Sequence, residues 1–148
     1  MSVTHDQFTI ERHYPYSPRQ TFSAFAEPEL RRQWFANPGG WDDAEWELDF
    51  RVGGSEINRG GGRAFECRFH DIVDAERIVY TYDLWHDGHL VSVSLAAIEF
   101  AARDGGTNLR FTEQGVFFDG EIAAAERKHG TGKLLDRLER FLAGAPVR

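Results

Sequence analysis

The alternation of hydrophobic and polar residues is the clearest pattern in the sequence. From Phe8 to Tyr14 apolar and polar residues alternate, which is typical of a strand with one buried face. Six further segments have the composition of strands, and glycine-containing turns separate them. A meandering antiparallel sheet of about seven strands is therefore expected, over residues 8–14, 45–50, 55–58, 64–73, 77–85, 90–101 and 108–115.

One of these segments changes the side on which its apolar residues lie. Val93 and Leu95 occupy odd positions. Ile98 and Phe100, later in the same segment, occupy even positions. A β-bulge at Ala96–Ala97 would account for the change, because one extra residue shifts the alternation and bends the strand.

Two short helices are expected after the first strand. Ser17 followed by Pro18 is typical of a helix start, with the serine as N-cap and the proline at the first helical position. A second helix opens at Glu27–Pro28, and Asn37–Gly40 is expected to end it.

The C-terminal segment has a helical period. On a wheel of about 100° per residue, its apolar residues and one arginine fall within about 60° of Leu138. An amphipathic helix, with Asp119 as its cap, is therefore expected to pack on the sheet. The residues of this stripe are Arg127, Thr131, Leu134, Leu135, Phe141 and Leu142.

Composition narrows the class of protein. The 148 residues suit a single α+β domain, residues 1–148, that buries its own core. The 12 Phe, 4 Trp and 4 Tyr are an unusual number of large flat side chains, which suit the wall of a binding pocket. The net charge of -7 argues against a nucleic-acid partner, which would need a basic surface.

The expected location is cytoplasmic. Cys67 is the single cysteine, so no intramolecular disulfide can form, and no secretion signal precedes Phe8. The longest mainly apolar stretch, residues 95–102, is far shorter than the ~20 residues that cross a bilayer. We therefore expect no membrane insertion.

Several short motifs resemble one known family. In their order and spacing they resemble the activator of heat-shock-protein-90 ATPase-like (AHSA-like) family, which belongs to the START and birch-pollen-allergen superfamily, also called SRPBCC. The resemblance covers almost the whole chain. The motifs are Glu27–Pro28–Glu29 with Trp34–Phe35, and the segments 49–54, 77–82, 106–115 and 130–138.

The resemblance implies a helix-grip fold, in which a curved sheet of about seven strands wraps the last helix. Relatives in the superfamily bind sterols, lipids or polyketides, or catalyse cyclisation. Activation of a chaperone ATPase is not expected, because this chain has no room for the additional N-terminal domain of the eukaryotic co-chaperone. A chaperone partner is accordingly the weakest of the expected partners.

A cleft between sheet and helix is the expected site, because a bent sheet and a helix cannot touch everywhere. Strand alternation points aromatic residues, and also Val93, toward it. The alternative is that these side chains simply fill a solid core. The candidate ligand-binding residues are Trp34, Phe35, Trp46, Phe65, Phe69, Tyr80, Tyr82, Phe111 and Phe117.

Glu113 is the sharpest polar candidate, because it continues the inward alternation of the last strand. A carboxylate there needs a partner, since burial of an unpaired charge is costly. Arg12 on the neighbouring first strand and Arg127 on the helix stripe can each supply one. We expect the three to form a cluster that binds a polar group of a ligand or positions Glu113 as general acid or base. The alternative is a salt-bridge network that only holds the helix to the sheet.

No cofactor and no metal are expected. His86, Asp87 and His89 lie in a predicted hairpin turn, but no further ligands follow at a recognisable spacing, so a solvated turn is the expected structure. The glycines form neither a dinucleotide-binding nor a Walker motif.

Three functions remain open. The first is binding of a small hydrophobic, aromatic or lipid-like molecule between the sheet and the last helix. The second is an enzyme of the polyketide cyclase, dehydratase or hydrolase type, with Glu113 as its candidate catalytic residue. The third is a protein-interaction module that acts on a chaperone or another subunit, and a homodimer is also possible.

Overall fold

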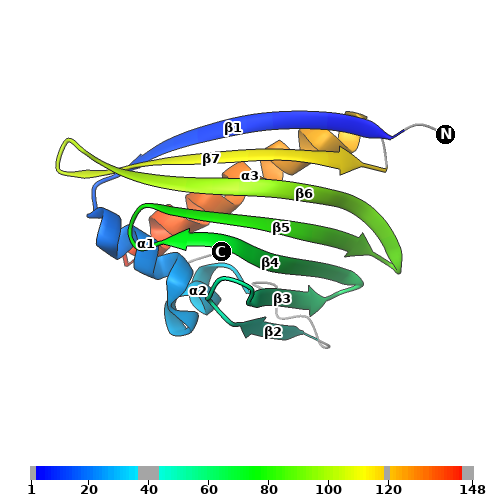
Figure 1. The fold of residues 1–148 in the computed structure, drawn as a ribbon, viewed down its shortest axis with the longest axis horizontal. Helices are drawn as coiled ribbons and strands as arrows, with labels where there is room; N and C mark the ends of the chain where they lie inside the picture. The colour runs from blue at the N-terminus through cyan, green and yellow to red at the C-terminus, as the bar shows by residue number, and fades with distance from the viewer. Residues whose placement is uncertain (1–2, 37–43, 119–120, 145–148) are drawn as a thin grey trace.

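The computed structural model describes residues 3–36, 44–118 and 121–144, without the side chains of 121–124. Within these residues seven strands form one curved antiparallel sheet in the order β1-β7-β6-β5-β4-β3-β2 (Figure 1). The predicted α+β fold is confirmed, and most strands are longer than their sequence signals. They are β1 (Thr4–Tyr14), β2 (Glu45–Leu48), β3 (Ser55–Gly60), β4 (Arg63–Val73), β5 (Arg77–His86), β6 (His89–Arg103) and β7 (Gly106–Phe117).

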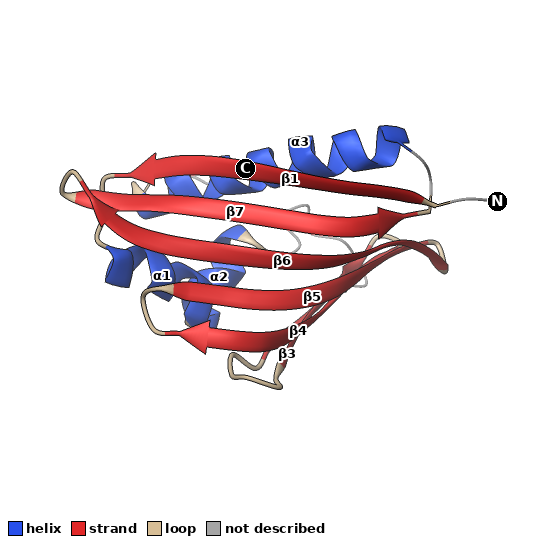
Figure 2. Cartoon of the chain, turned by 45° about the horizontal axis from the view of Figure 1, so that its top comes forward, coloured by secondary structure: helices blue, strands red, loops and turns tan. Residues whose placement is uncertain are grey.

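All three helices lie on one face of the sheet, called here the inner face (Figure 2). They are α1 (Pro18–Ala26), α2 (Pro28–Trp34) and α3 (Glu121–Leu142). Helix α3 crosses this face diagonally and contacts mainly β1, β7, α1 and α2. The inner face of β3 to β5 therefore lies beside α3 rather than beneath it. None of the described helices is both long and apolar enough to cross a membrane.

The two short helices begin where the sequence predicts. The Ser17 side chain accepts a hydrogen bond from the Gln20 N–H at 3.1 Å, and Pro18 occupies the first turn of α1. The extended backbone of Glu27 ends α1 and begins α2. The indole of Trp34 donates to the Ala24 carbonyl at 2.9 Å and so joins the two helices. Asn37–Gly40 and Asp119 lie outside the described residues.

Helix α3 presents its predicted stripe to the sheet. Thr131, Leu135 and Leu138 are buried, and the other stripe residues are partly buried. The Tyr14 hydroxyl donates to the Leu135 carbonyl at 3.0 Å, which fastens α3 to β1. Because the hydroxyl is buried, its pKa is raised well above 10 and it stays protonated.

The predicted bulge at Ala96–Ala97 is wrong. Strand β6 keeps a continuous register with β7 from Ser92 to Arg103. Its buried positions are even throughout, beginning with Ser92 and Ser94, while Val93 and Leu95 face outward. The sequence misleads here because two serines occupy the inner face and two apolar residues the outer face. The irregularities lie elsewhere, between Phe69 and Asp71 and beside Leu84–Trp85.

Candidate functional site

A buried carboxylate, Glu113 on β7, lies at the centre of a polar cluster on the inner face. Its side chain is 1% exposed. The Tyr82 hydroxyl from β5 lies 2.9 Å from Oε1 and 2.8 Å from Oε2, and Ser94 from β6 donates to Oε2 at 2.7 Å. Arg127 from α3 donates from Nη1 to Oε2 at 3.1 Å. Three side chains therefore hold the carboxylate, and one of them carries the balancing charge.

Arg127 connects α3 to three strands through this cluster. Besides Glu113, its Nη1 donates to the Tyr82 oxygen at 2.8 Å, and its Nη2 donates to Ser92 at 2.7 Å. Its guanidinium also lies 5.2 Å from the ring centre of Phe117, within the range of a cation–π contact. The Arg127 side chain keeps 11% of its surface exposed. It is thus the one member of the cluster that reaches the edge of the interior.

Tyr82 acts as a donor toward Glu113 and as an acceptor toward Arg127. Burial, together with the neighbouring negative charge of Glu113, raises the pKa of Tyr82 well above its usual value near 10. The hydroxyl therefore stays protonated at neutral pH. Removal of one partner of such a buried ion pair lowers the free energy of unfolding by about 3–5 kcal/mol, because the other charge stays buried alone.

The predicted role of Arg12 in this cluster is wrong. On β1 the residue opposite Glu113 is Phe8, whereas Arg12 is opposite Leu109. Four residues of a strand span about 13 Å, so Arg12 is on the inner face but too far along it. Its Nη1 instead pairs with Asp136 of α3 at 2.7 Å.

A second buried ion pair joins α2 to β3, and the sequence analysis missed it. Arg31 donates from Nε and Nη2 to the two carboxylate oxygens of Glu56, at 2.9 and 2.8 Å. The indole of Trp46 donates to Glu56 at 3.1 Å, and the guanidinium lies 3.6 Å from the ring centre of Phe35. Arg31 precedes Trp34 and Phe35 by three and four positions, which places the three on one helix face. This spacing in the sequence could have identified Arg31 as an inward-facing residue of α2.

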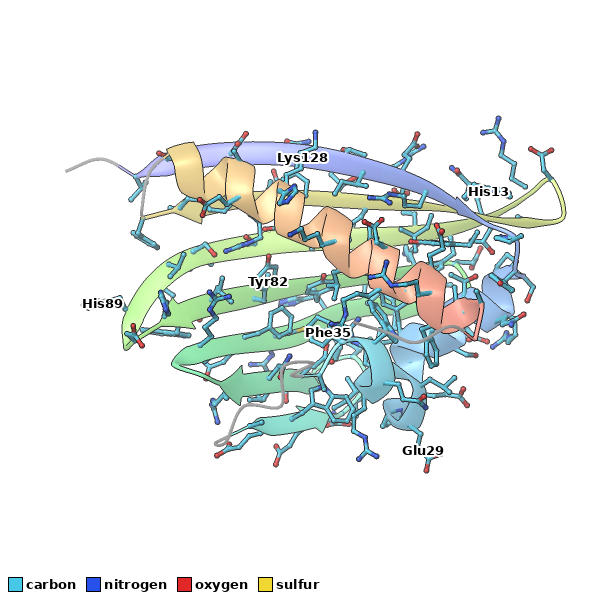
Figure 3. All side chains as sticks on the ribbon, turned by 180° about the vertical axis from the view of Figure 1, so that it is seen from behind. His13, Glu29, Phe35, Tyr82, His89 and Lys128 are labelled. Atoms are coloured by element: carbon cyan, nitrogen blue, oxygen red, sulfur yellow. The ribbon has the colours of Figure 1, made fainter. Side chains whose placement is uncertain are left out.

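The predicted aromatic residues separate into two groups. Trp34, Phe69, Phe111 and Phe117 are buried and pack into the core. Phe35, Trp46 and Phe65 are only partly buried, although they point to the inner side. The ring of Phe65 lies 5.2 Å from that of Phe35 and 4.8 Å from that of Tyr82. Figure 3 shows Tyr82 on the part of the sheet that α3 does not cover, and Phe35 nearby at the end of α2.

We call the partly exposed residues Phe35, Trp46, Phe65 and Leu84, together with the buried Tyr82 beside them, the aromatic surface. Tyr80 lies next to it, with its ring 5.9 Å from that of Tyr82. Its hydroxyl makes no hydrogen bond to the described residues, and burial raises the pKa of Tyr80 well above 10. The aromatic surface therefore borders both the Glu113 cluster and an unused hydroxyl donor.

The buried space deeper in this region is small. A cavity of about 10 Å³ lies between Arg31, Glu56 and Tyr80, among others. This is room for about one water molecule. Larger hollows are open to solvent, and one of about 690 Å³ lies on the outer face around Val93, Leu95 and Val116. Val93 thus belongs to the outer face and not to the expected cleft.

Neither the Cys67 thiol nor the β5–β6 turn with His86 and Asp87 has the features of a reactive site. Cys67 is buried, and burial raises the pKa of its thiol well above the usual range, so it is no nucleophile at neutral pH. In the β5–β6 turn, His86 and Asp87 are exposed and 3.5 Å apart. Among the residues that the structure describes, no group of three or more His, Cys, Asp or Glu side chains could hold a metal ion.

The carboxylate of Glu113 is enclosed by its hydrogen-bond donors. Glu113 is closed to solvent, and Tyr82, Ser94 and Arg127 donate hydrogen bonds to its carboxylate. A general acid or base must reach a proton of the substrate, and here the carboxylate oxygens point into the cluster. Arg127 and the partly exposed residues of the aromatic surface are less closed to solvent.

A curved antiparallel sheet that holds a long C-terminal helix is the helix-grip fold of the SRPBCC superfamily. The chain belongs to the family described as Activator of Hsp90 ATPase homolog 1-like protein, whose model matches residues 15–143. The predicted resemblance is therefore confirmed. Among the curated proteins, none matches the chain.

Two solved structures share the whole domain. The Mll3558 protein from Rhizobium loti is 42% identical, with 95% of this chain and 99% of that chain covered and a TM-score of 0.87. A putative uncharacterized protein from Rhizobium leguminosarum is 39% identical, with 96% and 97% covered and a TM-score of 0.90. An HSP90 activator from Plasmodium falciparum, PFC0360w, is 20% identical, with 93% and 96% covered and a TM-score of 0.71, and shares the fold alone.

Proposed function

We propose that the protein binds a small, mainly aromatic molecule on the aromatic surface beside α3, with Arg127 at the edge of the site. The observation that carries this proposal is the partial exposure of Phe35, Trp46 and Phe65 on the inner side of the sheet. Exposure of neighbouring aromatic side chains to water is unfavourable, whereas their contact with a flat apolar ligand would be favourable.

Polar groups at the margin support the same proposal. Binding sites for small molecules combine an apolar lining with a few fixed hydrogen-bonding groups. Arg127 and the Tyr80 hydroxyl are such groups, and the contacts of Arg127 with Tyr82, Glu113 and Ser92 hold its guanidinium in one orientation. A fixed donor loses little side-chain freedom when a ligand binds, which favours affinity.

A panel of aromatic and lipid-like compounds tests the proposal by thermal shift and calorimetry. A ligand at about 100 times its dissociation constant stabilises the folded state by ~2.7 kcal/mol, a readily measured shift. We expect aromatic ketones and phenols to shift the melting temperature. Phe65→Ala should weaken their binding at least tenfold.

Leu95→Ala is the matched control, because Leu95 is an exposed apolar residue on the opposite face of the same sheet. It should leave the affinity unchanged. Equal losses in the two variants, or no shift with any compound of the panel, would contradict the proposal.

A further inference from the structure

Strand β1 is the long free edge of the sheet. It stands at one end of the strand order, and among the described residues no backbone group pairs with its second side (Figure 1). The Gln7 N–H lies on that side, because it donates to the neighbouring Asp6 side chain at 2.8 Å instead of to β7. Since peptide groups alternate along a strand, the odd-numbered residues of β1 present their N–H and C=O groups to the free edge. Such an edge can take up a further strand.

The sequence of β1 is complementary to itself when two copies run antiparallel about Thr9. This register pairs all 11 residues of the strand and brings the odd-numbered residues of the two copies together, so their free N–H and C=O groups can bond. It places Asp6 opposite Arg12 of the second copy, and Phe8 opposite Ile10 of the second copy. These are the non-hydrogen-bonded pairs, whose side chains lie closest. A centre one residue to either side leaves residues unpaired and loses the Asp6–Arg12 pair.

A cationic hollow lies beside the free edge, between the inner side of β1 and α3. Its volume is about 440 Å³, and its lining includes Arg12 from β1 and Lys128, His129 and Lys133 from α3. Asp136 also lines the hollow, but it is already paired with Arg12 at 2.7 Å. Neither lysine forms an ion pair with the residues that the structure describes. In a chain of net charge -7, this local positive charge favours an acidic side chain from a neighbouring molecule.

Asp6 carries the matching charge. It is exposed and forms no ion pair within the described part of the chain, and its carboxylate accepts only the Gln7 N–H. Because it is an even-numbered residue of β1, it shares the inner side of the strand with Arg12. When a second strand takes up the Gln7 N–H, the Asp6 carboxylate is released to meet Arg12 and the adjacent lysines of the second copy.

We propose that two copies of the chain associate through β1, as an antiparallel strand pair centred on Thr9, with Asp6 of each copy at the cationic hollow of the other. The two sheets then form one continuous sheet. The aromatic surface lies toward the opposite edge of the sheet, so the outcome for this interface is separate from the outcome for the proposed function.

Sedimentation velocity at increasing protein concentration tests the association. The unaltered chain should form a dimer. Asp6→Arg should weaken the dimer by about tenfold or more, because it places like charges opposite each other at two positions. Glu47→Arg is the matched control, since it makes the same change of charge at an exposed position of β2, the opposite edge strand. It should leave the dimer unchanged, and equal effects of the two substitutions would overturn the inference.

Thr9→Cys tests the register. The two introduced thiols would lie on the outer face with their Cα atoms about 5.5 Å apart, within reach of a disulfide. Mild oxidation should therefore give a covalent dimer on a non-reducing gel. Thr112→Cys is the control, because Thr112 is the β7 neighbour of Thr9 and its two copies would lie about 15 Å apart. The native Cys67 is buried and does not compete.

Asp6 and Thr9 are exposed, and the melting temperature of each variant shows whether it is folded. A chain that stays monomeric at the highest attainable concentration would overturn the inference, and an acidic peptide that then bound the hollow would show that the edge serves another partner. A dimer that gives no cross-link with Thr9→Cys, or an equal one with Thr112→Cys, would also overturn it.

Discussion

The Tyr82 hydroxyl lies 2.9 and 2.8 Å from the two carboxylate oxygens of Glu113, so one phenol spans the whole carboxylate. The two residues lie on strands that are separated by β6 in the sheet. Ser94 of β6 completes the contact from between them. A charge deep in the interior is thus held by neighbouring strands, and α3 is attached to them through Arg127.

Tyr82→Phe should lower the free energy of unfolding by about 1.5–3 kcal/mol, the range for a hydrogen bond to a charged group. Urea denaturation measures the loss. Tyr80→Phe is the matched control, since the Tyr80 hydroxyl has no partner among the described residues, and it should cost clearly less. An equal effect of the two substitutions would show that the Tyr82–Glu113 contact contributes nothing.

Glu113→Leu should be more damaging, at about 3–5 kcal/mol, because it leaves the guanidinium of Arg127 buried without a counter-charge. The double variant Glu113→Leu/Arg127→Met removes both charges. It should be less destabilised than the sum of the two single variants, as denaturation midpoints would show. Simple additivity of the two losses would mean that the pair is not energetically coupled.

The Arg31–Glu56 pair should likewise matter for stability. Arg31→Lys keeps the charge and loses the two-pronged contact with Glu56 and the stacking on Phe35. We expect a lower melting temperature and a change in tryptophan fluorescence, since the Trp46 indole binds the same carboxylate. Asp74→Asn removes the exposed partner of Arg19 and should have no measurable effect. Similar effects of the two substitutions would contradict this difference.

Stability should fall at high pH. The pKa values of Tyr14, Tyr80 and Tyr82 are raised in the folded protein, mainly by burial. Above about pH 10 the unfolded chain loses these protons while the folded protein keeps them, so the unfolded state becomes relatively more favourable. The stabilising effect is complete below pH 10 and declines as the pH rises further.

Denaturation midpoints between pH 8 and pH 11 measure this decline. Tyr82→Phe should make the decline shallower, because one of the three groups no longer titrates. If stability declined with pH as steeply in Tyr82→Phe as in the unaltered protein, Tyr82 would not contribute to the decline.

Much of the fold follows from the sequence because alternation is a local property. The period-2 strands, the Ser17 cap and the stripe around Leu138 each depend on residues within one element. The same reasoning placed Glu113 and Arg127 on surfaces that face each other. It failed in β6, where Ser92 and Ser94 point inward to meet Glu113 and Arg127. Burial of these two serines is favourable only because Glu113 and Arg127 provide their hydrogen-bond partners.

Outside β6, the sequence by itself determined which face of a strand or helix a residue occupies. The tertiary structure alone decided how far along that face two residues meet. Arg12 and Arg127 both point inward, yet the strand register places Phe8, and not Arg12, beside Glu113. Arg12 forms its ion pair with Asp136 instead. Arg31 and Glu56 meet only because α2 packs against β3. Alternation repeats every two residues and cannot distinguish these positions, whereas register and packing are set by contacts between distant parts of the chain.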